Sequence, residues 1–231
     1  MPRISGWSLI RLYTILVYVW MFTPIVAVLI LSFNPQQFGS FPMEGFSLRW
    51  YAKLMQNETI LRAFENSLLL GSLTAVISTS IGILAALAFV RYEFPGKNTL
   101  NTLLLSPIMI PEVVLGVALL LFIRWLQQPK SFALLLIGHV VLTLPYVLLI
   151  VQARLVGIRR DYEEAAKSLG ANPLQTFKEV TLPLLMPAIL AGMLFAFTIS
   201  FDDITATLFW ATARDQTVPV KIFGMLRNSI S

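Results

Sequence analysis

The chain has 231 residues, of which 57% are apolar and only 13% are charged, and its mean hydropathy is +0.76. Soluble domains carry about 25% charged residues, so this composition excludes an ordinary soluble globular protein. The formal charge of +5 comes from scattered basic residues that flank apolar runs, which argues against nucleic-acid binding, and the absence of cysteine excludes disulfides and thiolate metal sites.

Four charge-free apolar runs are long enough to cross a hydrocarbon core of about 30 Å, which needs about 20 helical residues. They cover residues 12–33, 66–90, 131–153 and 180–201. A fifth run, 98–123, is equally apolar but is interrupted by Glu112. Each run must be helical, because lipid offers no partner for unpaired backbone groups. We therefore predict an all-α membrane protein, a single domain over residues 1–231 with five spans.

The first run is too long for a secretory signal, and no small-residue cleavage site follows it, so we predict an uncleaved anchor. Basic residues are divided almost evenly between the two sides of the membrane. The short segments are more informative, because basic residues lie before the first span and just after the fourth: Arg3, Arg11, Arg154, Arg159 and Arg160. The positive-inside rule places these segments in the cytoplasm, and with them the loop 154–183.

The segment between the first two spans, residues 34–65, is polar with scattered aromatic residues. Its second half, 47–65, predicts a short helix on the outer surface with Ser47 as the N-cap. Tryptophans near the ends of spans are typical of an interfacial belt, and we assign Trp7, Trp20, Trp125 and Trp210 to such a belt.

The cytoplasmic loop predicts a helix, a glycine turn and a second helix. Residues 161–169 are rich in helix formers, with acidic residues in the first turn, where the helix dipole favours them. Gly170 follows at the position where a glycine ends a helix in the left-handed conformation. Asn172 then caps a second helix that begins with Pro173, runs to about Glu179 and is followed by the last span. Local physics leaves two interpretations: a surface amphipathic loop, or a docking element.

The spacing in this loop, Glu164-Ala165-Ala166, Gly170 and then Leu182-Pro183, resembles the EAA loop of bacterial ABC-importer permeases. The family has isoleucine where this chain has Val180. The resemblance implies a type I importer transmembrane domain, in which these six motif residues form the coupling element that docks on a cytoplasmic ATPase. The chain itself lacks a phosphate-binding loop, so we predict no enzymatic site here, with ATP and magnesium bound by the partner.

Acidic residues inside apolar runs are costly, so their positions are informative. Glu112 follows two prolines, and Asp202 and Asp203 end the fifth run. We predict a cation-attracting path lined by these three carboxylates. The alternative for the aspartate pair is that it ends or caps a helix at the outer interface. His139, within the fourth run, is expected to be a hydrogen-bonded packing residue.

Further segments widen the resemblance to nearly the whole chain. The motifs FSLRWYAKL, SPIMIPE, EEAAKSLGA and SFDD look like the second permease subunit of spermidine/putrescine importers. This likeness implies a polyamine path in the bacterial inner membrane. It also implies three kinds of partner: a homologous permease, two copies of an ATPase subunit and a periplasmic substrate-binding protein. The family normally has a sixth span after the segment matching 218–228, which is expected to be absent here.

Three alternatives stay open at this point. Relatives with the same architecture carry iron, thiamine or aminophosphonates, so the cargo could differ. An intramembrane enzyme would need a catalytic set within the spans, and the candidates Ser106, Glu112, His139 and Asp202 match no recognised active-site motif. An ion channel would conduct without ATP, and no repeated filter motif supports it.

Overall fold

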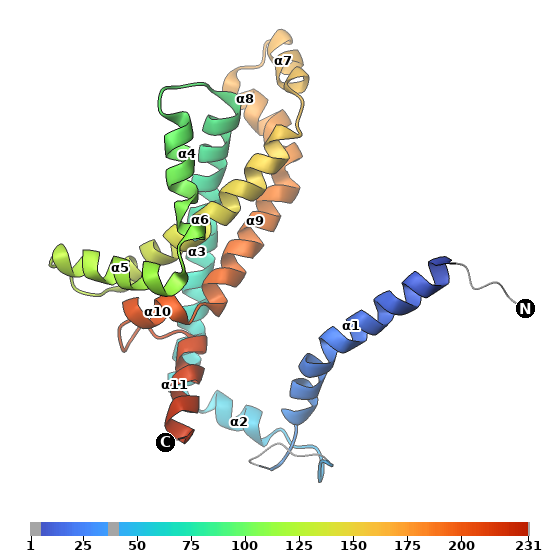
Figure 1. The fold of residues 1–231 in the computed structure, drawn as a ribbon, viewed down its shortest axis with the longest axis vertical. Helices are drawn as coiled ribbons and strands as arrows, with labels where there is room; N and C mark the ends of the chain where they lie inside the picture. Colours follow the sequence, from blue (N-terminus) through green and yellow to red (C-terminus); the bar gives the residue numbers. More distant parts are fainter. Residues whose placement is uncertain (1–5, 37–41, 231) are drawn as a thin grey trace, which may run out of the picture. The chain divides into compact units, whose positions relative to one another are not determined.

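A computed structural model describes residues 6–36 and 42–230, which are helical with connecting turns (Figure 1). The chain divides into two compact units, Met1–Leu61 and Arg62–Ser231. Within the described residues, four helices are long and apolar enough to cross a membrane. The number of candidate spans rises to five if one bent pair of helices forms a single span. The all-α prediction is confirmed, and the prediction of one membrane domain stays a prediction.

The first unit contains α1 (Gly6–Leu31) and α2 (Arg49–Met55). The indole N–H of Trp50 donates to the Asn34 carbonyl oxygen at 2.8 Å, which joins α2 to the end of the first span. The predicted helix over 47–65 is wrong in extent, since α2 stops at Met55. Asn57 provides the physical reason: its side chain accepts from the Ile60 N–H at 3.2 Å and starts a new helix. Ser47 lies outside α2, where Leu48 occupies the N-cap position.

The second unit holds the remaining helices, and α3 reaches into it from the first. In chain order these are α3 (Glu58–Arg91), α4 (Lys97–Leu105), the 3₁₀ helix η1 (Ser106–Met109), α5 (Glu112–Trp125), α6 (Phe132–Val156), α7 (Arg160–Ser168), α8 (Pro173–Thr176), the π-helix η2 (Phe177–Thr181), α9 (Leu182–Asp202), α10 (Thr205–Trp210) and α11 (Val218–Ile230).

The bundle core is formed where α3, α6 and α9 cross at Val147. A Cβ on Gly82 of α3 would lie 2.7 Å from the Val147 side chain, and one on Gly192 of α9 would lie 3.3 Å from it. Transmembrane helices associate through small residues of this kind, because lipid provides no hydrophobic force between helices. Close approach at these glycines brings the helices together, and large side chains such as Leu148, Leu155 and Leu185 fill the core around them.

The third predicted span is divided in two. The helical pair α4–η1 and α5 is bent by 112° at Ile110 and Pro111 (Figure 1). Pro107 and Pro111 explain the break, since each removes a backbone N–H and Pro111 disfavours helical geometry at Ile110. The expected continuous helix over 98–123 is corrected accordingly. Glu112 lies in the first turn of α5, immediately after the break.

Trp210 fixes α10 against two other helices. Its indole N–H donates to the Gly116 carbonyl oxygen of α5 at 2.8 Å, and only 2% of the residue is exposed. Its ring packs on Gly138 of α6. The assignment of Trp210 to an interfacial belt is therefore wrong, because a tryptophan near an apolar boundary can be buried when its N–H has a partner.

Replacing Gly138 by alanine is expected to destabilise the second unit, because the new Cβ would collide with the Trp210 ring. Overpacking of this kind costs about 1–3 kcal/mol. Thermal unfolding in detergent measures the effect. Gly224→Ala is the control, since a Cβ there meets nothing within 4 Å. Equal midpoints for the two variants would contradict the packing described for Trp210.

Candidate functional site

The first helix of the cytoplasmic loop, α7, ends as the sequence predicts. Gly170 has φ +91°, and its N–H donates to the Lys167 carbonyl oxygen at 3.0 Å. The next N–H, from Ala171, donates to the Ala166 carbonyl oxygen at 3.1 Å. These two bonds form a Schellman motif, which requires a left-handed residue at the position of Gly170. The predicted glycine turn is confirmed.

The second helix begins with a capping box. The Asn172 side chain accepts from the Gln175 N–H at 2.9 Å, and the Gln175 side chain accepts from the Asn172 N–H at 2.9 Å. Pro173 occupies the first helical turn, as predicted. The predicted end near Glu179 is wrong, because α8 passes through η2 into α9 without a break. The second loop helix and the last span therefore form one continuous helical rod over residues 173–202.

The motif residues lie along this helix–turn–helix. Glu164 and Ala165 are exposed on α7, Ala166 is half-buried, and Gly170 forms the turn. Leu182 is half-buried and packs on the core at the start of α9, while Pro183 is exposed in its first turn. The structure therefore presents Glu164 and Ala165 on the surface and uses Leu182 to attach the loop to the bundle.

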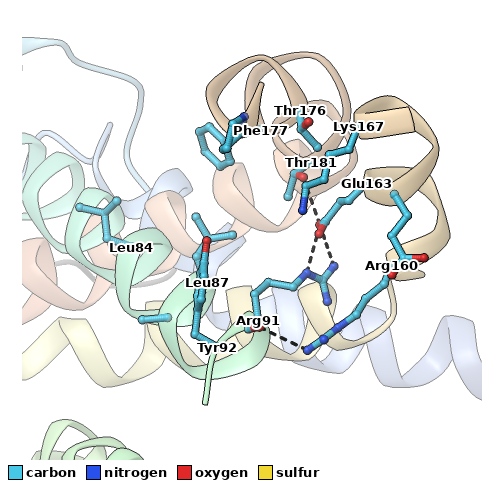
Figure 2. A pocket seen from close by; sticks show the side chains of 13 residues that line it. Leu84, Leu87, Arg91, Tyr92, Arg160, Glu163, Lys167, Thr176, Phe177 and Thr181 are labelled. Carbon is cyan, nitrogen blue, oxygen red and sulfur yellow. Dashed lines mark hydrogen bonds and ion pairs between the residues drawn. The ribbon is translucent and has the colours of Figure 1, made fainter. Parts of the chain in front are cut away.

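A neighbouring residue that the sequence does not single out, Glu163, joins the loop to two other elements. Its carboxylate pairs with the Arg91 guanidinium at 3.0 Å and accepts from the Thr181 hydroxyl at 3.1 Å. Arg91 also donates to the Ile158 carbonyl oxygen at 3.1 Å, and Arg160 donates to the Val90 carbonyl oxygen at 3.1 Å. Figure 2 shows these side chains converging from α3, α7 and η2.

We call Arg91, Arg160, Glu163 and Thr181 the arginine clasp. A cavity of about 440 Å³ adjoins it, with the apolar residues Leu84 and Leu87 on one wall and Phe177 on another (Figure 2). The only sequence signals for the clasp are a basic residue at the end of the second span and an acidic residue beside the EAA motif. Neither signal indicates that residues separated by 72 positions pair.

The predicted substrate-path carboxylates are not equivalent. Asp203 is buried, and its carboxylate accepts from the Thr207 N–H at 2.7 Å, the Thr207 hydroxyl at 2.6 Å and the Ala206 N–H at 3.3 Å. These bonds cap α10. Asp202, the adjacent residue, is exposed. The capping alternative therefore describes the observed contacts of Asp203, while Asp202 keeps a carboxylate available at the surface of the bundle.

His139 of α6 links this cap to α9. Its Nδ1 lies 2.8 Å from the Ser200 hydroxyl, and its Nε2 lies 3.0 Å from the Thr207 hydroxyl. Because Thr207 donates its own proton to Asp203, it accepts from Nε2–H of His139, and in a neutral imidazole Nδ1 then accepts from the Ser200 hydroxyl. The fully buried imidazole thus has a partner at each nitrogen. This geometry agrees with the predicted packing role.

Glu112 lies apart from the coupling loop, at the break in the third span. It is exposed and lines a cavity of about 210 Å³ together with Pro111, Tyr146 of α6 and Ile199 of α9. The carboxylate lies in the first turn of α5, where the helix dipole favours a negative charge, and it faces a cavity between helices. Its predicted place on a cation path stays a prediction. The site residues therefore form two groups: those of the coupling loop, and three carboxylates outside it, with Glu112 at the span break and Asp202 and Asp203 at the end of α9.

Residues 78–227 match the family described as "Binding-protein-dependent transport system inner membrane component". The chain belongs to this family. Its members are inner-membrane components of transport systems that depend on a binding protein. The matched residues include the coupling loop and the three carboxylates Glu112, Asp202 and Asp203.

Curated members of the family resemble this chain over most of their length. The chain is 35% identical to the spermidine/putrescine transport system permease protein PotC of Escherichia coli, over 93% of this chain and 81% of that protein. It is 33% identical to PotC of Haemophilus influenzae, over 98% and 88%. It is 31% identical to the putrescine transport system permease protein PotI of Escherichia coli, over 98% and 82%.

A solved structure resembles the fold. A bacterial ABC transporter that imports the acidic polysaccharide alginate superimposes with a TM-score of 0.75, at 15% identity, over 96% of this chain and 80% of that chain. At this identity the likeness concerns the fold alone. It agrees with the predicted all-α transmembrane fold.

Proposed function

We propose that this subunit forms half of a translocation path for polyamines and is driven by a separate ATPase that docks on the loop 154–183. The identity of 35% with a spermidine/putrescine permease over most of both chains carries this proposal. The exposed Glu164, Ala165 and Gly170 would meet the ATPase, and Leu182-Pro183 would transmit the movement into α9. ATP and magnesium would bind in the ATPase rather than in this chain.

Two further partners complete the proposed importer. A homologous permease supplies the other half of the path, and a periplasmic substrate-binding protein delivers the solute to the outer face. Closure of the ATPases moves the loops and exchanges an inward-open path for an outward-open one, as in other rigid-body switches. Spermidine and putrescine are cations, so Glu112 and Asp202 provide carboxylates of the sign that such a cargo requires.

Uptake of labelled spermidine and putrescine by cells that express the complete transporter tests the cargo. We expect ATP-dependent accumulation that an excess of unlabelled polyamine suppresses. Ferric and thiamine competitors are included because an importer of the same architecture could carry them. Suppression by one of these competitors, with no effect of polyamine, would replace the proposed cargo and leave the type of machine unchanged.

Replacing Glu164 by alanine is expected to lower substrate-stimulated ATPase activity by about 10-fold, because an exposed carboxylate that pairs with a basic group on the ATPase is lost. The subunit is expected to insert normally, since Glu164 is exposed. Glu44→Ala in the first unit is the control. Stimulation at the level of the unmodified complex would exclude Glu164 from the docking surface.

A further inference from the structure

Apolar packing does not hold the coupling helix α7 in place. None of its nine residues, all within the described part of the chain, is buried, and Leu169 beyond its end is 90% exposed. The cavity of about 440 Å³ lies where apolar side chains of α3 face the loop. A helix without buried residues depends on polar contacts for a fixed orientation, because its own hydrogen bonds do not set its direction.

The arginine clasp supplies those contacts in both directions. Arg91, at the end of α3, donates to the Ile158 carbonyl oxygen and pairs with Glu163 of α7. Arg160, on α7, donates to the Val90 carbonyl oxygen at the end of α3. Terminal carbonyls of a helix lack partners within the helix, so this guanidinium satisfies one of them. Each helix thus provides the arginine that holds the other.

Glu163 extends the clasp to the last span. The same oxygen that pairs with Arg91 accepts from Thr181, a buried residue at the end of the π-helix η2. π-Helical turns are rare and less regular than α-helical ones, so a side-chain bond at this turn fixes its conformation. The pair is also shielded from solvent, with side-chain exposures of 10% for Arg91 and 14% for Glu163. Shielding strengthens the ionic contact relative to an exposed pair.

We infer that the arginine clasp is the transmission joint of this subunit, in which Arg91 and Glu163 are positioning residues that make α3, α7 and the η2–α9 rod move as one body. The inference rests on the proposed function, since it needs an ATPase that displaces α7. In a subunit with a broken clasp, α7 would still bind the ATPase. Its movement would no longer be passed fully to the spans, so ATP would be hydrolysed without transport.

The first arm of the test measures labelled spermidine transported per ATP hydrolysed by the complete complex in proteoliposomes. Glu163→Leu removes the contacts of the carboxylate with Arg91 and with Thr181. It is expected to lower the transport ratio by about 10-fold. Glu163→Gln keeps an acceptor for Thr181 and is expected to have a smaller effect. The exchange Arg91→Glu with Glu163→Arg restores the ionic pair and is expected to recover part of the loss. Glu93→Gln, in an exposed ion pair with Lys97, is the matched control.

The second arm is independent of the cargo. The chain lacks cysteine, so Leu169→Cys and Asn98→Cys allow specific spin labelling of the full-length chain in nanodiscs. We expect a narrow distance distribution that broadens in Glu163→Leu and not in Glu93→Gln. Unchanged width together with an unchanged transport ratio in Glu163→Leu would overturn the inference. Absence of spermidine import by the unmodified complex, with broadening still present, would instead refute only the proposed cargo.

Discussion

Replacing Gly170 by proline is expected to lower ATP-driven import and substrate-stimulated ATPase activity by at least about 10-fold while the subunit still inserts. Gly170 has a φ of +91°, whereas proline holds φ at about −65°. Proline also removes the N–H that donates to the Lys167 carbonyl oxygen. The turn between α7 and α8 would therefore open, and Glu164 and Ala165 would lose their position relative to α9. Import and ATPase activity are measured on the reconstituted complex.

Two alanine variants separate this effect from general backbone strain. Gly170→Ala and Gly96→Ala each force alanine into the left-handed region, at φ +91° and +78°, and neither new Cβ meets an atom within 4 Å. Left-handed geometry costs a non-glycine residue about 1–2 kcal/mol at either site. We expect coupling to fall in Gly170→Ala and to persist in Gly96→Ala. Equal activity of the two variants would mean that the turn at Gly170 has no special part in coupling.

Asp203→Ala is expected to lower the free energy of unfolding by about 3 kcal/mol. The substitution removes the acceptor of two backbone N–H groups and of the Thr207 hydroxyl, all buried. A buried donor left without an acceptor costs about 1–3 kcal/mol, and loss of a helix cap costs about 1 kcal/mol. His139 also loses a fixed partner, because the Thr207 hydroxyl next to its Nε2 is itself held by the bond to Asp203. Denaturation of the detergent-solubilised chain measures the change.

Asp202→Ala is the matched control for this measurement, since it removes the same group from the adjacent, exposed position. Its stability is expected to stay within about 0.5 kcal/mol of the unmodified protein. If Asp202 faces the cargo, the half-saturating polyamine concentration rises in this variant instead. Equal destabilisation by the two substitutions would contradict the cap assigned to Asp203.

Local signals in the sequence predicted the coupling loop well. Gly170, Asn172 and Pro173 each act on their immediate neighbours, so their effects can be inferred without knowledge of the fold. Local signals did not predict the end of the second loop helix, because they carry no information on how the helix continues beyond the loop. Nothing local to Glu179 shows that α8 continues through a π-helix into α9, where Leu182 packs against the core.

Contacts between residues far apart in the sequence could not be predicted from local sequence patterns. Glu163 and Arg91 are 72 positions apart, and the pattern around each is compatible with an exposed charge. Trp210 lies near the end of an apolar segment, where an interfacial position is as consistent with its neighbours as the buried one observed. The break at Pro111 was signalled by two prolines. Its angle of 112° could not be predicted, because contacts distant in the sequence, such as the bond from Trp210 of α10 to Gly116 of α5, accompany the bent arrangement.

The most direct test of the account is photo-crosslinking from the tip of the coupling helix. A photoreactive amino acid at Leu169, which is 90% exposed, is introduced into cells that express the complete transporter. The same amino acid at Phe46, which is 80% exposed in the first unit, is the control. We predict an adduct from Leu169, and not from Phe46, that mass spectrometry identifies as an ATPase subunit with a phosphate-binding loop. No ATPase adduct from Leu169 in a complex that imports normally would contradict the account.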